Sequence, residues 1–369
     1  MERASRRSIV LLVVFGTLIG VGLGGGIGYG VVSYLRSHDD DFGISQEVAG
    51  EGAGFESLED LRRAMLSRDE RDLKADRSVS LRALVQPHSS DEIIYTLRPN
   101  FEAKFQGVPV KTNSFGMRSP ERAIEKPKGT YRIALLGDSF AFGWGVEADK
   151  IFAQVLEDRL NQASAGRLKV EVLNFGVPGY STFQEVAQFL ETGMQFSPDA
   201  VLIYFVENDF GMPFFVRDFS EAEKALAPSS GFEKMRSKVK TEGDPESQKR
   251  MQYLLSLADA NHAVLKLNKE LSPRNIPIYL TINPRNKWKK DEHRLWVLKQ
   301  VPEIRHLKLR DGFMEIFNGE KLTVPDIKLP GDAHPNAKMH AMLGELLAKE
   351  FLPAVEEKIS IGLGPKSSG

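Results

Sequence analysis

The sequence predicts an α/β protein: a three-layer α/β/α sandwich in which a mostly parallel, five-stranded sheet is covered by helices on both sides. Two observations predict this class. Short apolar segments rich in strand-forming residues alternate with segments whose apolar residues recur at helical spacing, a pattern typical of parallel sheets. Residues 200–205 (AVLIYF) form an unbroken apolar run, as expected of a central strand buried on both faces.

The expected elements alternate along the second half of the chain. Strands are expected over 133–136, 169–173, 200–205, 276–282 and 305–309, and helices over 152–160, from 182 onward, over 251–258 and over 336–352. Residues 210–247 interrupt this alternation with a charged, proline-containing insert. The insert is too long for a simple connection, and we interpret it as a lid.

Residues 9–35 contain no charged residue and are long enough to cross a bilayer, which takes about 20 residues. Arg3, Arg6 and Arg7 precede this segment, so we expect residues 1–8 in the cytoplasm and the bulk of the chain on the extracytoplasmic side. The segment is longer than the apolar core of a cleaved signal peptide and lacks a clear cleavage site. These features favour a retained, single-pass membrane anchor, with cleavage as the alternative.

A glycine stripe runs along this apolar segment. Gly16, Gly20, Gly24 and Gly28 recur at every fourth residue, which places them on one face of a helix. Such a face lets a second helix approach closely, so the stripe predicts a homodimer. The alternative is that glycine is simply frequent in membrane helices.

Composition shifts divide the remainder of the chain. Residues 36–85 are expected to be a juxtamembrane linker and residues 86–128 a small β-rich extension, in which Asn113 and Arg118 line a substrate rim or serve the structure alone. The main domain is expected over 129–354, followed by a flexible tail over 355–369.

Composition excludes several kinds of site. The chain has 369 residues, a formal net charge of -1 and no cysteine. The near-zero charge gives no support for nucleic-acid binding, and the lack of cysteine excludes a Cys nucleophile, a thiolate metal site and disulfides. The histidines lack metal-ligand spacing, so no metal and no cofactor is expected.

The first expected strand ends abruptly at Gly137-Asp138-Ser139. Open α/β sheets place their sites at the carboxyl ends of strands, which makes Ser139 the candidate nucleophile. The alternative is an ordinary turn, since Gly, Asp and Ser all favour turns.

Four separated segments decide between these interpretations, because together they resemble the SGNH (GDSL-type) hydrolase family. They are residues 137–140 (GDSF), 174–182 (NFGVPGYST), 207–209 (END) and 332–336 (DAHPN), in the family's order. The resemblance covers about residues 131–352 and implies a flavodoxin-like sheet. One position departs from the family, whose third segment usually reads Gly-x-Asn-Asp, because Val206 stands where the glycine is expected. The G-x-S-x-G elbow of α/β-hydrolases is absent around Ser139.

The resemblance implies a catalytic triad. A serine hydroxyl needs an adjacent base to become a nucleophile, and His334 would take the proton from Ser139 and return it to the leaving alcohol. Asp332 would bind the other imidazole nitrogen and fix the tautomer of His334. His340 is expected to be structural.

The resemblance also implies an oxyanion hole. Its donors would be the backbone N–H groups of Ser139 and Gly179 and the side-chain amide of Asn208. Gly176 is the rival of Gly179 for this role. A further expectation concerns Asp138 and Asp209, which would brace their loops and not react.

These residues predict a serine esterase that acts on an acylated glycan, a lipid or a small ester. The same residues would serve an O-acyltransferase that passes the acyl group to an envelope polysaccharide, because acceptor binding and water exclusion decide between the two. A third alternative is a non-catalytic binding protein with the same fold.

Overall fold

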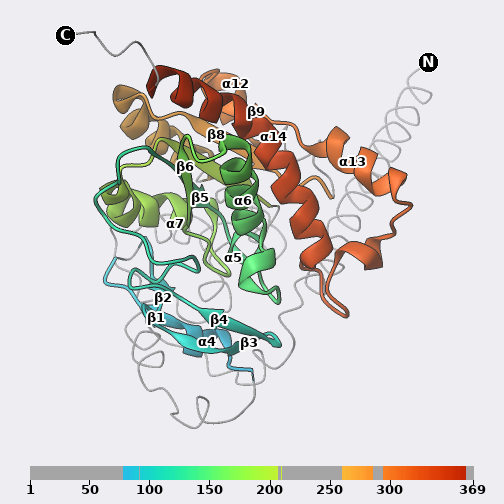
Figure 1. Cartoon of the computed structure of the whole chain (residues 1–369). Helices are drawn as coiled ribbons and strands as arrows, with labels where there is room; N and C mark the ends of the chain where they lie inside the picture. Colours follow the sequence, from blue (N-terminus) through green and yellow to red (C-terminus); the bar gives the residue numbers. More distant parts are fainter. Residues whose placement is uncertain (1–77, 91, 207–208, 210–259, 286–293, 363–369) are drawn as a thin grey trace, which may run out of the picture. The chain divides into compact units, whose positions relative to one another are not determined.

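The computed structural model describes residues 78–90, 92–206, 209, 260–285 and 294–362. The chain divides into two compact units, residues 1–50 with 330–333, and residues 51–329 with 334–369. Of the first unit, the described residues are 330–333, which form a turn and a bend. The elements below belong to the second unit (Figure 1).

Several predictions from the sequence concern residues that lie outside this description. They include the anchor over 9–35 with its glycine stripe, and the insert over 210–247. Among the described residues, none of the helices has the length and apolar character needed to span a bilayer.

The centre of the second unit is a five-stranded sheet with the order β6-β5-β7-β8-β9. Its strands are β5 (Thr130–Leu136), β6 (Lys169–Asn174), β7 (Ala200–Phe205), β8 (Ile278–Ile282) and β9 (Arg305–Leu307). Every neighbouring pair is parallel. The predicted α/β class and five-stranded parallel sheet are therefore confirmed.

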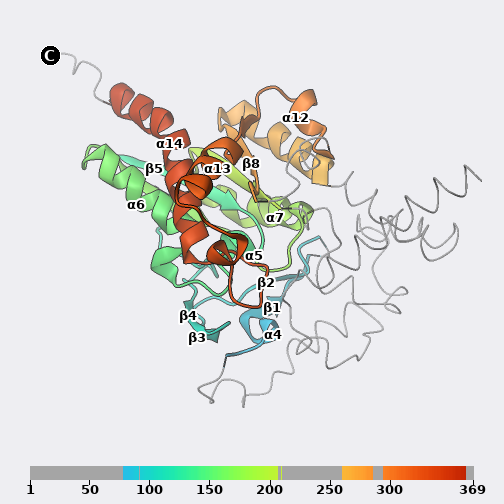
Figure 2. The ribbon, with the colours of Figure 1, turned by 90° about the vertical axis from the view of Figure 1, so that its right-hand side faces the viewer.

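Helices cover both faces of this sheet (Figures 1 and 2). One face carries α6 (Phe152–Ser164), α13 (Arg310–Gly319) and α14 (Ala337–Gly362), and the other carries α7 (Thr182–Gln188), the helix over 260–271 and α12 (Val297–Gln300). Because side chains point alternately to the two faces of a strand, each strand contributes side chains to both layers. Ile133 and Leu135 of β5 face α6 and α14, whereas Ala134 and Leu136 face the opposite layer.

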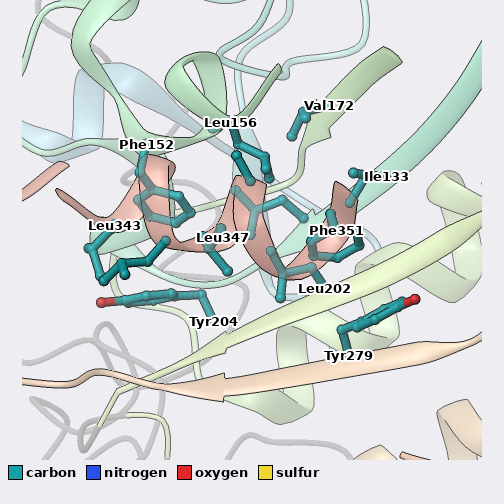
Figure 3. Close-up of a cluster of buried hydrophobic side chains, with 14 of the residues drawn as sticks. Ile133, Phe152, Leu156, Val172, Leu202, Tyr204, Tyr279, Leu343, Leu347 and Phe351 are labelled. Carbon is teal, nitrogen blue, oxygen red and sulfur yellow. The ribbon is translucent and has the colours of Figure 1, made fainter. Parts of the chain in front are cut away.

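Figure 3 shows the core between the sheet and the first of these helical layers. Leu343, Leu347 and Phe351 of α14 pack there with Leu202 and Tyr204 of β7. Complete burial of a side chain of this size stabilises the fold by about 1.5–3 kcal/mol.

Helix α14 is longer than predicted. The sequence predicted an end at residue 352 and a flexible tail from 355, but α14 continues through Pro353 to Gly362. Proline removes a helical hydrogen bond and normally ends a helix. Here Phe351, Val355 and Ile359 recur at every fourth residue and are all buried, so packing on the sheet outweighs that cost. The prediction of a flexible tail is therefore wrong for residues 355–362.

The extension before the sheet contains the helix α4 (Leu81–Leu84) and four short strands. The strands are β1 (Val85–Pro87), β2 (Tyr95–Leu97), β3 (Glu102–Phe105) and β4 (Val108–Lys111). They pair antiparallel as β1 with β2 and β3 with β4. The strands expected within 86–128 are thus present, and the first of them begins at Val85.

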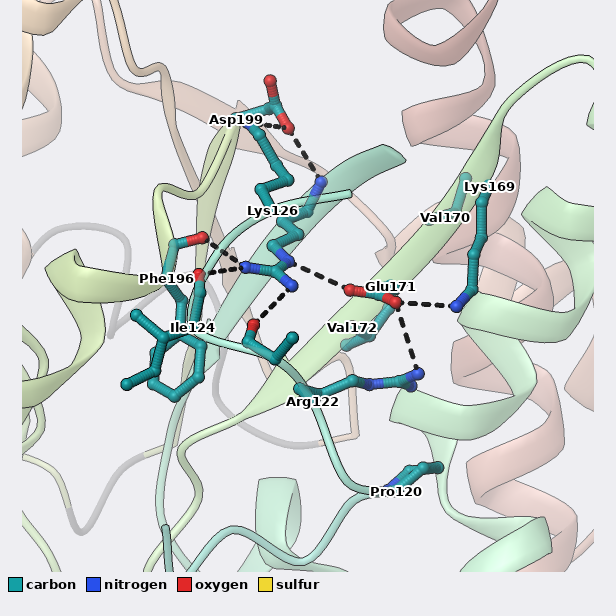
Figure 4. A network of polar contacts seen from close by, with 12 residues as sticks. Pro120, Arg122, Ile124, Lys126, Lys169, Val170, Glu171, Val172, Phe196 and Asp199 are labelled. Carbon is teal, nitrogen blue, oxygen red and sulfur yellow. Dashed lines mark hydrogen bonds and ion pairs between the residues drawn. The ribbon is translucent and has the colours of Figure 1, made fainter. Parts of the chain in front are cut away.

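A buried charge network ties the last part of the extension, residues 122–126, to the sheet (Figure 4). Arg132 of β5 is fully buried, and its guanidinium donates to Glu171 of β6 at 3.0 Å and to the carbonyls of Ala123, Ile124 and Phe196 at 2.7–2.9 Å. Burial by itself raises the pKa of Glu171, but Lys169, Arg132 and Arg122 together hold that pKa below its usual range. Glu171 is therefore the anion that this network depends on.

We predict that Glu171→Gln is strongly destabilising, because it leaves a buried guanidinium without its anion. Loss of one partner from a buried ion pair costs about 3–5 kcal/mol, and urea unfolding measures the change. The matched control is Glu102→Gln, whose ion pair with Lys111 is exposed, so its effect should stay within about 0.5 kcal/mol. Equal stability of both variants and the parent would contradict the prediction.

His340 lies on the buried side of α14, as expected of a structural residue. Its Nδ1 accepts a hydrogen bond from the Phe152 N–H at 3.1 Å, and its ring stacks on that of Phe152 at 5.6 Å between centroids. Burial, with smaller contributions from the charges of Arg118 and His334, lowers the pKa of His340 to about 3. The imidazole is therefore neutral in the folded protein at neutral pH.

This pKa predicts a loss of stability in mild acid. Below a pH of about 6.5 the unfolded chain binds a proton at His340 that the folded chain does not bind. The contribution of His340 to the free energy of unfolding should therefore fall by about 1.4 kcal/mol per pH unit as the pH drops from 6.5 towards 3. His340→Gln, whose amide can still accept from Phe152, should show a shallower decline in urea unfolding at pH 7, 6 and 5. Identical slopes for the variant and the parent would rule this origin out.

Candidate active site

Ser139 is the first residue of the short helix α5 (Ser139–Phe142), and Gly137 and Asp138 join it to the carboxyl end of β5. Asp138 caps this helix, because its Oδ1 accepts a hydrogen bond from the Phe140 N–H at 2.9 Å. The carbonyl of Ser139 accepts from the N–H groups of Gly143 and Trp144 at 3.0 Å. A residue at the start of a helix has no helical acceptor for its own N–H, so the N–H of Ser139 remains available for a ligand.

Close packing explains the glycine before this turn. A Cβ on Gly137 would lie 2.6 Å from the Cβ of Ala141 and 3.3 Å from the carbonyl oxygen of Tyr204. Any larger residue would push α5 away from the end of β7. Gly137 therefore lets the serine approach the edge of the sheet.

The structure brings Ser139 and His334 together although 195 positions separate them. His334 Nε2 lies 2.8 Å from Ser139 Oγ, and the two residues are 2% and 5% exposed. The hydroxyl also lies within 3.2 Å of Asp138 Oδ2. A hydroxyl has one proton to donate, and the shorter contact is the one to the imidazole.

Two features hold His334 in this position. Its ring stacks on Trp144, with centroids 4.8 Å apart and planes 13° apart, and packs against Phe140 at 5.5 Å. Its carbonyl accepts from the Leu329 N–H at 2.9 Å, next to a bridge between Lys328 and Pro335. His334 therefore has both its ring and its backbone fixed.

The roles of two predicted site residues are not tested by the described contacts. Asp332 lies in the bend of residues 330–333, two positions before His334, and belongs to the first compact unit. Asn208 lies outside the described residues. The roles assigned to both from the sequence stay predictions.

Gly179 occupies a tight turn after β6. The Tyr180 N–H donates to the Val177 carbonyl at 3.2 Å, and Gly179 has a φ of +81°. A proline in the second position of a turn and a glycine with positive φ in the third are typical of a type II turn. The Val177 N–H donates in turn to the Gly137 carbonyl at 3.1 Å, so this turn is joined to the one that presents Ser139.

The rival glycine has a different role. The N–H of Gly176 donates to Asn174 Oδ1 at 2.9 Å and is thus already used. A Cβ on Gly176 would lie 2.4 Å from the Phe142 nitrogen. Gly176 therefore serves close packing against α5, which leaves Gly179 as the better candidate donor.

Three buried carboxyl groups interact with one another near Ser139, those of Asp138, Glu185 and Asp209. Burial, with the charge of Asp138, raises the pKa of Glu185 well above its usual range. Burial, with the charges of Glu185 and Asp138, does the same to the pKa of Asp209. Protons held by this group limit the negative charge beside Ser139.

The expectation that Asp138 and Asp209 brace their loops agrees with their contacts. Asp138 caps α5, and Asp209 Oδ2 accepts from the Val206 N–H at 2.9 Å. Val206 is not among the described residues with positive φ. The backbone at position 206 therefore does not need the glycine that the family usually has there.

Arg118 and Asn113 are structural in their contacts and do not form a rim. Both are buried. The Arg118 guanidinium donates to the carbonyls of Gly143 and Val146 at 2.6 Å, beyond the end of α5. Burial lowers the pKa of Arg118 to about 10, which keeps it charged at neutral pH. Asn113 Oδ1 accepts from the N–H groups of Phe115 and Met117 and closes a turn.

Sequence reasoning missed Trp144 and Tyr95, which contact His334 and the Gly179 turn. Trp144 follows the Gly-Asp-Ser turn closely and was a detectable signal, whereas nothing in the sequence linked Tyr95 to residue 178. The part of the chain that the structure describes contains no group of three His, Cys, Asp or Glu side chains able to hold a metal ion.

A cavity of about 840 Å³ lies at the opposite edge of the sheet, at the amino ends of its strands. Tyr131, Asp199, Tyr279 and Arg305 are among its lining residues, and neither Ser139 nor His334 is. This cavity is therefore separate from the candidate active site.

Comparison with solved structures finds similar folds at low identity. A two-domain esterase active on acetylated mannans, co-crystallised with mannopentaose, is 16% identical, with a TM-score of 0.41 over 62% of this chain and 50% of the other. A lipolytic protein of the G-D-S-L family from Desulfitobacterium hafniense, described as putative, is 15% identical, with a TM-score of 0.34 over 59% and 98%. The acetylxylan esterase Axe2 from Geobacillus stearothermophilus is 17% identical, with a TM-score of 0.38 over 61% and 94%.

Likenesses at this level do not assign a substrate. The match spans half the length of the two-domain esterase. No curated protein matches this chain in sequence.

The family comparison is decisive, since it covers more than half of the chain. The profile of the GDSL-like Lipase/Acylhydrolase family matches residues 135–342, which include both Ser139 and His334. The chain belongs to this family and is a serine hydrolase that acts on ester bonds.

Proposed function

We propose that the protein is a serine esterase that cleaves carboxylic esters through an acyl-enzyme on Ser139. The observation that carries the proposal is the distance of 2.8 Å between Ser139 Oγ and His334 Nε2. An imidazole nitrogen in hydrogen-bond contact with a serine hydroxyl is the arrangement that activates this nucleophile.

The proposed reaction has two steps. Ser139 Oγ attacks the carbonyl carbon of the ester while His334 Nε2 takes the hydroxyl proton and then delivers it to the leaving alcohol. Water next attacks the acyl-enzyme, with His334 again as the base. Asp332 would hold the Nδ1 proton of His334 and stabilise the imidazolium in each step.

The negative charge of each tetrahedral intermediate needs hydrogen-bond donors. We assign the N–H groups of Ser139 and Gly179 to this role, with the side-chain amide of Asn208 as the third donor. The start of α5 leaves the first N–H without a helical acceptor. Each such donor is worth about 10²–10³ in turnover.

Our proposals for the substrate and the location rest on the sequence alone. We propose a single-pass anchor over residues 9–35, an extracytoplasmic catalytic domain, and an acylated glycan, lipid or small ester as substrate. The glycine stripe from Gly16 to Gly28 is the proposed homodimer contact. Protease protection in sealed vesicles tests the orientation, because only an extracytoplasmic domain would resist protease added to the cytoplasmic side.

We predict that Ser139→Ala removes esterase activity. With the full chain in mild detergent and acetyl and butyryl aryl esters as substrates, kcat/KM should fall by at least about a thousand-fold, because the nucleophile is lost. Phenol release measures the rate. The matched control is Ser272→Ala, an exposed serine at the opposite edge of the sheet, which should leave the rate unchanged. A Ser139→Ala variant that keeps a tenth of the activity would refute the assignment.

Transfer to a sugar hydroxyl is the second candidate function. The observation that favours it is the burial of both reactive groups, since an enclosed acyl-enzyme is shielded from water. An acceptor hydroxyl would then take the place of the water, with His334 removing its proton in the same way.

The partition of the acyl group separates the two functions. With an aryl acetate as donor and a neutral disaccharide as added acceptor, we expect one acetate for each phenol released and a rate that the sugar does not change. Chromatography of the products measures the ratio. Acetylated disaccharide as the main product, formed at a rate that saturates with the sugar, would replace the esterase proposal with acyl transfer.

A further inference from the structure

The extension makes a direct contact with the turn that carries Gly179. The hydroxyl of Tyr95, on β2, donates to the carbonyl of Pro178 at 2.9 Å, across 83 positions of the chain. Tyr95 is fully buried. This hydrogen bond therefore forms away from competing water.

The geometry of the peptide bond gives this contact its consequence. The Pro178 carbonyl and the Gly179 N–H belong to one planar, trans peptide unit, so they point in opposite directions. A donor that fixes the carbonyl on one side also fixes the direction of the N–H on the other.

This peptide unit is the central one of the turn over residues 177–180, and it is the unit that can rotate. In a type II turn the third residue has positive φ, whereas in a type I turn the central peptide is turned over and the third residue has negative φ. Gly179 has a φ of +81° here, but a glycine adopts either sign at little cost. The turn by itself therefore does not fix the direction of the Gly179 N–H.

Further contacts hold the extension against this turn. The Tyr180 hydroxyl donates to the Tyr95 carbonyl, and the two rings meet edge to face with centroids 5.1 Å apart. Gln184 Nε2 donates to the Ile93 carbonyl at 2.8 Å. Tyr95 is thus held by both its backbone and its ring.

The backbone before Tyr95 is strained in a way that requires such support. Ile94 is buried and has a φ of +69°, and the Tyr95 N–H donates to the Ile93 carbonyl at 2.8 Å. A γ-turn with positive φ at a β-branched residue is rare and strained. Strain of this kind persists where surrounding contacts over-determine the conformation, and it clusters at functional sites.

We propose that Tyr95 is a positioning residue that holds the Gly179 N–H in the direction of the oxyanion, so that the extension completes the active site of the hydrolase domain. The proposal rests on the proposed function, in which Gly179 is an oxyanion donor. Tyr95 acts through the Pro178–Gly179 peptide and touches no reacting atom.

The Tyr95→Phe variant tests this proposal in the full chain. It keeps the ring and removes only the hydroxyl, so the peptide is free to turn over. Because loss of a whole oxyanion donor costs about 10²–10³ and this loss is partial, kcat should fall roughly 10- to 100-fold with little change in KM. Binding of an aryl trifluoromethyl ketone, whose serine adduct carries an oxyanion, should weaken by a similar factor.

The matched control is Tyr279→Phe. The Tyr279 hydroxyl also takes part in a hydrogen bond, a partly buried one that it accepts from Arg305, but Tyr279 lines the cavity at the opposite edge of the sheet. Its removal should leave kcat and ketone affinity within about two-fold of the parent. Titration with an aryl phosphonate measures the concentration of reactive serine. Each kcat is then expressed per reactive serine, so that misfolded protein does not lower the value.

The outcomes are distinct. An unchanged kcat per reactive serine in Tyr95→Phe, or a loss that the Tyr279→Phe control shares, would overturn the positioning role. If the Ser139→Ala variant keeps its esterase activity, the proposed function itself is overturned, whatever the effect of Tyr95→Phe. A ten-fold or larger loss in kcat with parallel loss of ketone affinity, confined to Tyr95→Phe, supports the proposal.

Discussion

The contact between Ser139 Oγ and His334 Nε2 joins two parts of the chain that lie 195 positions apart, and much of the fold serves to place its two ends. The parallel sheet brings Ser139 to the carboxyl end of β5, and the capped start of α5 fixes its direction. The other end depends on Trp144, which stacks on the imidazole, and on the backbone pairing around Leu329. A small displacement of either residue would lengthen or bend this hydrogen bond, and a hydrogen bond weakens steeply as its angle departs from linear.

Close packing is what makes this placement precise. Gly137 and Gly176 both lie where a Cβ would collide with α5, so the helix rests directly on two backbone segments. Arg118 holds the carbonyls that follow α5, and Asn174 Nδ2 donates to the Ala141 carbonyl at 2.7 Å. The short helix that begins with Ser139 is therefore held on several sides, although four residues would not form a stable helix alone.

The sequence predicted the sheet well because the patterns that indicate its strands are local. Unbroken apolar runs such as residues 200–205 mark buried parallel strands, and the Gly-Asp-Ser turn marks the end of the first one. The end of α14 was mispredicted because Pro353 is a local signal that a tertiary effect, the burial of Val355 and Ile359, outweighs. The role of Arg118, at a substrate rim or in the structure alone, could not be decided from the sequence for a similar reason, since a sequence does not show which carbonyls a guanidinium will reach.

In the candidate site, too, the residues marked by local sequence patterns were predictable and those placed by tertiary contacts were not. Ser139, His334 and Gly179 were predictable because their neighbours resemble recurring motifs at strand and helix ends. Tyr95 was not, because the hydrogen bond from its hydroxyl to the Gly179 turn spans 83 positions and joins the extension to the main sheet domain. Contacts of this kind depend on the packing of two separately formed elements, which no local pattern encodes.

The central claim is a covalent acyl group on Ser139, and the most direct measurement is to trap it. The full-length protein would be mixed with a butyryl aryl ester, quenched in acid within the first turnover, digested and analysed by mass spectrometry. We expect a butyryl group on the peptide that contains Ser139. A butyryl group on another residue, or phenol release with no acylated peptide at any quench time, would contradict it.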